Sequence, residues 1–189
     1  MYKKIILASA SPRRRRLLKQ IGFEFEVIPS KIKEYNIYPG YPYANAEGLA
    51  LLKAQDVAVN MDDGIIIGAD TQVLSDEEAL GKPEDEADAF RMLSKLEGKT
   101  HTVITGVALM DAATDQIETW VEETLVKFRS LEENEIRSYI ATGEPMGKAG
   151  AYGIQGRAAA FVNRIEGCYF NVVGLPLSSL VQKIRKLME

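Results

Sequence analysis

The sequence predicts a mixed α/β domain (α+β in type), in which helices pack on a sheet of parallel and antiparallel strands. The run Gly64–Leu74 is apolar on both faces as far as Ile67, which is typical of a central strand. Residues Thr100–Met110 and Ile117–Phe128 alternate between apolar and polar side chains, and the turn-rich segment between them predicts a long hairpin. Helical and strand-like patterns mix without strict alternation, which favours a mixed sheet over a doubly wound parallel fold.

The size and composition of the chain fit one globular domain with a real core. The 189 residues are 46% hydrophobic, and no linker or internal repeat divides them, so residues 1–189 are predicted to form a single domain that can have two lobes. The net charge of -4 disfavours a nucleic-acid coat protein, whose affinity depends on excess basic charge. No segment reaches the ~20 apolar residues of a membrane helix, which predicts a soluble, cytoplasmic protein.

The scarcity of cysteine and histidine restricts the possible metal chemistry. Cys168 is the single cysteine and His101 the single histidine, which excludes a disulfide framework and any zinc site built from several such residues. A catalytic metal would have to be held by carboxylates, and this points to Mg²⁺ or Mn²⁺. Both Cys168 and His101 are interpreted as packing residues rather than catalysts.

The N-terminal stretch predicts a strand, a tight turn and a helix. Lys4–Leu7 is a short apolar run, Ser11 is a suitable N-cap, and Pro12 suits the first helical position. A helix N-terminus offers unpaired N–H groups and the positive end of a dipole, so it can bind phosphate. Ser9 adds a hydroxyl, and Arg13 adds a guanidinium suited to phosphate oxygens. The alternative is an ordinary surface helix rich in arginine.

Three further elements follow before the central strand. Phe23–Ile28 alternates and predicts a second strand, whereas Pro29–Tyr43 is a loop long enough to be functional. Ala44–Asn60 is predicted to be a helix. Glu34 in the loop and Lys53 in the helix are charged residues of the types that bind metal ions and phosphates, although most such residues are simply solvated.

Asp70 is the strongest single candidate for chemistry. It follows the buried strand, where a partly desolvated carboxylate can bind a metal or accept a proton from water. The alternative is a turn-forming aspartate, which is common after strands. Arg13, Lys53 and Lys82 together would suit a triphosphate, and Glu34 with Asp70 would suit its magnesium. Spacing alone does not establish that these residues converge.

The second half of the chain predicts more helices, a strand and a glycine-rich loop. Helices are expected at Asp85–Leu96, from a capping box at Ser130, and at the C-terminus, and a strand at Ala158–Ile165. Lys148–Gly156 is rich in glycine but matches neither the P-loop nor the dinucleotide-binding pattern. Gln155 within it can donate and accept together, which suits the edge of a nucleobase. Alternatively, the side-chain amide of Gln155 forms hydrogen bonds with backbone groups of its own loop.

Five segments in register resemble the Maf family of nucleoside triphosphate pyrophosphatases, and together they cover nearly the whole chain. The segments are Leu7-Ala-Ser-Ala-Ser-Pro-Arg-Arg14, Ile67-Gly-Ala-Asp-Thr71, Gly81-Lys-Pro83, Glu144-Pro-Met-Gly-Lys-Ala-Gly-Ala-Tyr-Gly-Ile-Gln-Gly156 and Val173-Gly-Leu-Pro176. The resemblance implies two lobes around a long, twisted mixed sheet with a central cleft, as in Maf and ITPase-like proteins. It also implies a homodimer that acts on a nucleoside triphosphate. The net charge and the lack of a long apolar segment, rather than the resemblance, predict that nucleic acid and membranes are not partners.

The resemblance implies a reaction and a role for each matching residue. The reaction is hydrolysis of a nucleoside triphosphate to the monophosphate and pyrophosphate, a house-cleaning step of nucleotide metabolism. Asp70 is implied as general base and metal ligand, and Glu34 as a second ligand to Mg²⁺ or Mn²⁺. The residues implied to contact phosphates are Ser9, Arg13, Lys53 and Lys82.

Three residues match the branch of the family that acts on dTTP and UTP, with modified pyrimidine nucleotides as further candidate substrates. They are Arg13, Thr71 and Gln155. Two positions depart from the family pattern: Lys33-Glu34 replaces two adjacent acids, and Met146-Gly147 stands where an acid commonly precedes the lysine. Two other functions stay open at this point. One is a nucleotide-binding regulator of septum formation without essential catalysis, and the other is a nucleic-acid binder using the arginine run.

Overall fold

A computed structural model describes residues 3–33, 36–76 and 78–188 of the chain. Its backbone contacts divide into two compact units. Unit 1 comprises Met1–Asp70, Thr105–Glu122 and Gly174–Glu189, and unit 2 comprises Thr71–Ile104 and Glu123–Val173. Three long strands contribute residues to both units: β3 (Ile65–Ser75), β5 (Thr100–Asp111) and β6 (Ile117–Phe128).

The strands form a mixed, open sheet, as the sequence predicts. The order is β2-β1-β3-β5-β6-β7, and β4 pairs with β3 outside this path. β1 (Ile5–Leu7) is parallel to β2 (Glu26–Val27) and to β3, whereas β4 (Glu78–Leu80) is antiparallel to β3 and β7 (Val162–Gly167) is antiparallel to β6. β5 and β6 are neighbours, so the predicted hairpin is confirmed.

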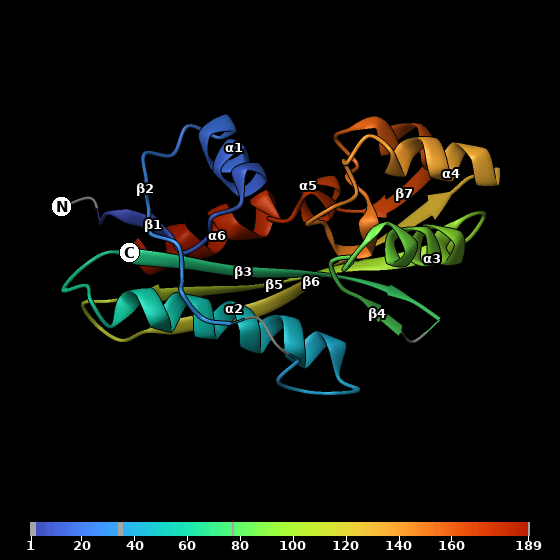
Figure 1. Cartoon of the computed structure of the whole chain (residues 1–189). Coiled ribbons are helices and arrows are strands. Elements are labelled where there is room, and N and C mark those ends of the chain that lie inside the picture. The colour runs from blue at the N-terminus through green and yellow to red at the C-terminus, as the bar shows by residue number, and fades with distance from the viewer. Residues whose placement is uncertain (1–2, 34–35, 77, 189) are drawn as a thin grey trace. The chain divides into compact units, whose positions relative to one another are not determined.

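Unit 1 is a layered arrangement of strands and three helices. α2 (Pro42–Ala58) lies on one side of the strands, and α1 (Pro12–Gln20) and α6 (Leu177–Met188) lie on the other (Figure 1). Small residues on α2 pack on the aliphatic strands, and the main buried members are Ile6, Ala8, Ala50, Ala54, Val57, Ala58, Ile66 and Ala108. Burial of these apolar groups is the main stabilising contribution within unit 1.

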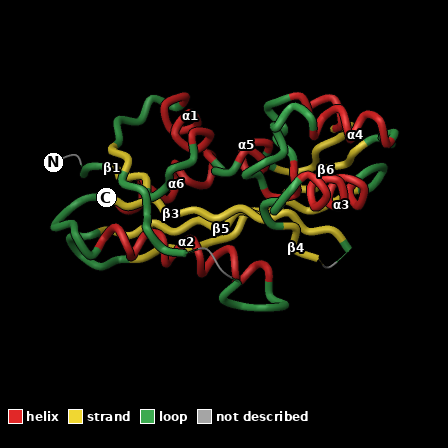
Figure 2. The backbone as a smooth tube through the Cα atoms, in the orientation of Figure 1, coloured by secondary structure: helices red, strands yellow, loops and turns green. Residues whose placement is uncertain are grey.

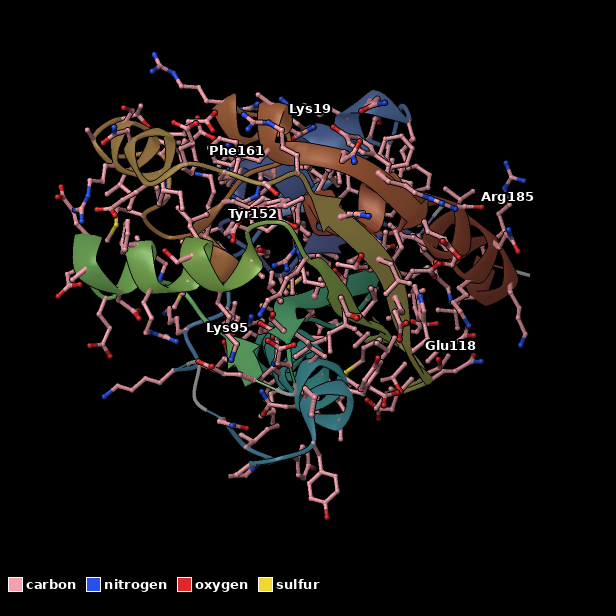
Figure 3. The ribbon with its side chains drawn as sticks, turned by 90° about the vertical axis from the view of Figure 1, so that its right-hand side faces the viewer. Lys19, Lys95, Glu118, Tyr152, Phe161 and Arg185 are labelled. Atoms are coloured by element: carbon pink, nitrogen blue, oxygen red, sulfur yellow. The ribbon has the colours of Figure 1, made fainter. Side chains whose placement is uncertain are left out.

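Unit 2 contains the remaining helices and an aromatic cluster. α3 (Glu86–Leu96) contacts α4 (Glu133–Ile140), and two short 3₁₀ helices, η1 (Ala149–Ala151) and η2 (Arg157–Phe161), precede β7 and α5 (Tyr169–Val173). The ring of Phe128 meets those of Tyr152 and Phe161 edge to face, at 4.9 and 6.0 Å between centroids. Figure 3 labels Tyr152 and Phe161. Such contacts stabilise a core beyond the area that they bury.

His101 belongs to this aromatic core, as its interpretation as a packing residue predicts. Its side chain is buried, its ring centroid is 4.9 Å from that of Phe128, and its Nε2 is 2.9 Å from the Tyr152 hydroxyl. Burial lowers the pKa of His101 to about 4, because the charged imidazolium loses its hydration. The ring is therefore neutral at physiological pH and serves packing.

Several predicted boundaries are wrong, and tertiary contacts explain the differences. The expected strand Phe23–Ile28 pairs only over β2, and the first residues of the expected strand Ala158–Ile165 instead form η2. The capping box lies at Glu132 rather than Ser130, and the Glu132 N–H donates to Glu135 at 3.1 Å. The alternation of Thr100–Met110 predicts a polar face, but β5 is buried at every position from Val103 to Leu109, and α2 lies against it at Gly106.

The connection between β2 and α2 is a loop over its described residues, as predicted (Figure 2). α2 begins at Pro42, two residues before the predicted start, since proline is well suited to the first turn of a helix. Among the described helices, not one combines the length and the apolar character needed to cross a membrane.

Candidate functional site

Asp70 and Lys53 form a buried ion pair within unit 1. Asp70 lies on β3 just past its fully buried run, and only 8% of the residue is exposed. Lys53 occupies the buried face of α2, with its Nζ 2.8 Å from Asp70 Oδ1 and 3.4 Å from the Ala69 carbonyl oxygen. The structure thus brings together two residues that the sequence predicts as separate candidates for the functional site.

The chemistry of this pair follows from its burial. A hydrogen bond between an ammonium and a carboxylate is stronger than one between neutral groups, and it holds both side chains in one orientation. Removal of either partner would leave the other as an uncompensated buried charge. The ion pair therefore holds the Asp70 carboxylate in one orientation, in which it can accept a proton. The Lys53 ammonium beside it can attract a phosphate oxygen.

Ser9 follows β1, the strand that pairs with the first residues of β3. β1 and β3 are parallel with Leu7 paired to Ile67, and the Ala8 N–H donates to the Ile67 carbonyl oxygen at 2.9 Å. Ser9 follows the carboxyl end of β1 and is itself buried. Ser9 thus follows the end of its strand, whereas β3 continues through Asp70 to Ser75, so the expectation that Asp70 follows the strand is wrong and Asp70 lies within it.

The turn after β1 is ordered by Arg14 rather than by Arg13. Arg14 Nη1 donates to Ser9 Oγ at 3.1 Å, and Arg14 Nε donates to the Gly174 carbonyl oxygen at 2.8 Å. The Ser11 hydroxyl caps α1 by accepting from the Arg14 N–H at 3.4 Å, as predicted. Sequence reasoning missed Arg14, although its spacing from the buried Leu17 and Leu18 places it on the same helical face.

Arg13 is half-buried near the start of α1. Burial, and secondarily the charge of Arg16, lower the pKa of the Arg13 guanidinium. A guanidinium nevertheless remains protonated in proteins, so Arg13 keeps its charge. A half-buried cation at a helix N-terminus suits an anionic ligand, since its hydration is already reduced.

Glu34 lies outside the described residues, but the segments on either side of it are held by α2. The Ser30 hydroxyl and the Lys31 N–H donate to Asp56 Oδ2 at 2.8 and 2.7 Å. The Ile37 N–H donates to Asn45 Oδ1 at 2.8 Å. The helix that carries Lys53 thus also holds the two ends of the loop that carries Glu34.

The described residues include a carboxylate, that of Asp70, of the kind that a divalent metal binds. No group of three or more His, Cys, Asp or Glu side chains suited to a metal ion occurs within residues 3–33, 36–76 and 78–188. Mg²⁺ in phosphate-transfer sites typically takes one or two carboxylates, with substrate phosphates and water completing its shell. Asp70 is a buried oxygen donor that fits this pattern, and Lys53 beside it would neutralise a further substrate charge.

Thr71, Lys82 and Gln155 belong to unit 2. Thr71 is half-buried, whereas Lys82 and Gln155 are exposed. The Gly150 N–H donates to the Gly81 carbonyl oxygen at 3.0 Å, so the glycine-rich loop is attached to the residue that precedes Lys82. The structure therefore connects two of the sequence segments that the family resemblance singled out.

Gln155 occupies a tight turn. The Gly156 N–H donates to the Gly153 carbonyl oxygen at 2.9 Å, and Ile154 is buried while Gln155 faces outward. Within the described part of the chain, no hydrogen bond joins the Gln155 amide to its own loop. The alternative in which this amide merely satisfies neighbouring backbone groups is therefore not supported.

Comparison with known proteins gives full-length matches. The family model described as Maf-like protein matches residues 4–187. A protein of Pelotomaculum thermopropionicum is 52% identical over 184 residues, covering 97% of this chain and 96% of its own. A protein of Ruminiclostridium cellulolyticum is 50% identical over 189 residues (99% and 97%), and one of Syntrophomonas wolfei is 53% identical over 173 residues (91% and 91%). All three relatives are named dTTP/UTP pyrophosphatase.

Proposed function

The chain belongs to the Maf-like protein family, and from that premise we propose that it is an enzyme that hydrolyses dTTP and UTP to the monophosphate and pyrophosphate. The observation that carries the proposal is the near-full-length identity of about one half to relatives named for this activity. A regulator of septum formation without essential catalysis is not favoured, because such a protein would not need the buried Asp70–Lys53 pair.

Within this proposal, Asp70 is the general base. Water must attack the α-phosphorus in line with the departing pyrophosphate, and a carboxylate can take its proton. The ion pair with Lys53 fixes the orientation of that carboxylate, at 2.8 Å between Nζ and Oδ1. The assignment rests on the burial and position of Asp70 together with the family resemblance.

In this proposal, one hydroxyl group and three cationic side chains bind the phosphates. Ser9, Arg13, Lys53 and Lys82 contact phosphate oxygens, and their donors offset charge that grows on the leaving pyrophosphate. We assign Asp70 and Glu34 as ligands of Mg²⁺ or Mn²⁺, which when bound supplies further positive charge to the phosphates. The family resemblance also supports a homodimer. The net charge of -4 and the lack of a long apolar segment in the sequence support a cytoplasmic enzyme without nucleic-acid or membrane partners.

Gln155 is proposed to read the base, with Thr71 shaping the pocket or contacting the sugar. The uracil and thymine edge presents O4, N3–H and O2, so one amide can pair with an oxygen and with N3–H together. We expect wild type to prefer UTP and dTTP to CTP, GTP and 7-methyl-GTP. Gln155→Glu should reduce kcat/KM for UTP about tenfold or more, because an unpaired buried polar group costs ~1–3 kcal/mol.

The control for Gln155→Glu is Gln116→Glu, an exposed glutamine in the turn between β5 and β6. It makes the same change of charge, and it should keep the wild-type order of substrates. Steady-state kinetics with the five triphosphates provide the measurement. A wild type that prefers a purine, or a Gln155→Glu variant slowed equally with every base, would show that Gln155 does not read the base.

Activity is expected to require a divalent metal. Excess chelator should abolish pyrophosphate release from UTP, and Mg²⁺ or Mn²⁺ should restore it, since oxygen ligands accept both ions. Glu34→Gln should raise the metal concentration needed for half-maximal rate more than it lowers the melting temperature. A metal titration with a pyrophosphate assay measures both effects, and full activity in excess chelator would exclude the requirement.

A further inference from the structure

Glu144 lies at the centre of a hydrogen-bond network in unit 2. The Tyr139 hydroxyl donates to Glu144 Oε1 at 3.0 Å, and the Arg157 N–H donates to Glu144 Oε2 at 3.0 Å. The Lys148 ammonium donates to the Glu144 carbonyl oxygen. One residue therefore ties the end of α4 to the start and to the end of the glycine-rich loop.

The carboxylate of Glu144 also rests directly on the backbone next to Gln155. A Cβ built on Gly156 would lie 2.1 Å from Glu144 Oε1 and 2.5 Å from its carboxyl carbon. Real Cβ atoms essentially never approach other atoms so closely, so only glycine fits at position 156 while Glu144 stays in place. The glycine that follows Gln155 is thus explained by the carboxylate packed against it.

One partner of Glu144, Tyr139, is itself fixed in the core of unit 2. The Tyr139 ring meets Phe161 edge to face at 5.1 Å between centroids, and Tyr139 is buried. Burial, with the neighbouring Glu144 charge, raises the pKa of Tyr139, so its hydroxyl stays protonated and able to donate. Tyr152 and Ile154, on the inner side of the loop, are buried as well.

The outer side of the loop has no such core to hold it. Gln155, Gly156 and Arg157 are all exposed, and Glu144 is the side chain that binds this stretch through its Arg157 N–H contact. An exposed glutamine can select a base only if its backbone is held in one place, because ordering a loose turn upon binding costs conformational entropy.

We infer that Glu144 is a positioning residue that holds the Gly153–Arg157 turn so that Gln155 can discriminate between bases. This inference rests on the proposed function, in which Gln155 reads the base. Glu144 acts through the turn and touches no substrate in this account. It should therefore affect base discrimination and KM more than kcat.

The test compares Glu144→Ala with Glu144→Gln. Alanine removes both acceptors, and we expect the UTP:CTP ratio of kcat/KM to fall about tenfold, mostly through a higher KM for UTP. Glutamine should rescue the ratio, because its carbonyl can accept from the Arg157 N–H while its amide donates to the Tyr139 oxygen. Glu133→Ala serves as the control, since Glu133 is an exposed acid of α4 paired with Arg137.

A second measurement separates this inference from the proposed function. Hydrogen exchange of the Arg157 N–H should be at least about tenfold faster in Glu144→Ala than in wild type, with or without a nucleotide present. Unchanged exchange, or an unchanged UTP:CTP ratio in a discriminating wild type, would overturn the positioning role. If wild type shows no discrimination while exchange in Glu144→Ala is faster, base reading by Gln155 is wrong and Glu144 still orders the turn.

Discussion

Replacing Asp70 with asparagine is expected to lower kcat for UTP by ~10²–10⁴-fold, the usual contribution of a general base. Asparagine keeps the shape of the side chain and an oxygen that can accept from Lys53 Nζ, but it cannot take a proton from water. The variant should still fold and bind a non-hydrolysable UTP analogue. The measurements are pyrophosphate release at saturating Mg²⁺, circular dichroism and analogue binding.

The matched control is Asp111→Asn in the same unit. Asp111 is also a buried carboxylate, with 1% of its side chain exposed, and it is paired with Lys3. Both substitutions remove the charge of a buried carboxylate from its ion pair, so both should lower the free energy of unfolding. Turnover should fall only in Asp70→Asn. Near wild-type turnover in Asp70→Asn, or an equal loss in both variants, would refute the general-base assignment.

Gly68→Ala is expected to cause a large loss of stability in unit 1. A Cβ at position 68 would lie 2.1 Å from the Ala50 carbonyl oxygen and 2.9 Å from the Ala54 N. These atoms belong to the backbone of α2, which cannot move aside as the end of a flexible side chain can. Overpacking of this kind typically costs ~1–3 kcal/mol, and we expect a value at the upper end or above.

Denaturant unfolding measures this effect, and Gly81→Ala provides the control. Nothing lies within 4 Å of a Cβ built on Gly81, so that variant should unfold within ~0.5 kcal/mol of wild type. Gly106→Ala should behave like Gly68→Ala, because its Cβ would lie 2.2 Å from the Ala46 carbonyl oxygen. Wild-type stability in Gly68→Ala would mean that α2 does not pack on β3 as described.

The close approach of α2 to the sheet connects this stability prediction with the site. Gly68 precedes Asp70 by two residues on β3, and Lys53 lies within the helical stretch that Gly68 contacts. Without a side chain at position 68, the helix comes near enough for Lys53 to reach the carboxylate at 2.8 Å. The sequence shows only that a glycine follows a buried apolar run, and it does not identify α2 as the element that approaches this glycine.

Local patterns were sufficient for much of the fold. The Ser11-Pro12 start of α1, the central β3 run and the β5–β6 pair were all predicted from residues close in sequence, because capping, propensity and alternation are local properties. The candidate residues on the family's motifs were likewise named from the sequence alone. Predictions of strand boundaries failed where contacts between distant residues set those boundaries. The strand predicted at Phe23–Ile28, for example, is reduced to β2, because only two of its residues pair with β1.

What the sequence by itself determined is the class of fold, the start of α1, the family and the residue types available for phosphate and metal chemistry. Only the tertiary structure decided which of those residues meet. Lys53 pairs with Asp70, Arg14 rather than Arg13 orders Ser9, and Glu144 holds the turn of Gln155. The physical reason is that these contacts join residues from 5 to 17 positions apart through a fold set by burial of side chains elsewhere in the chain.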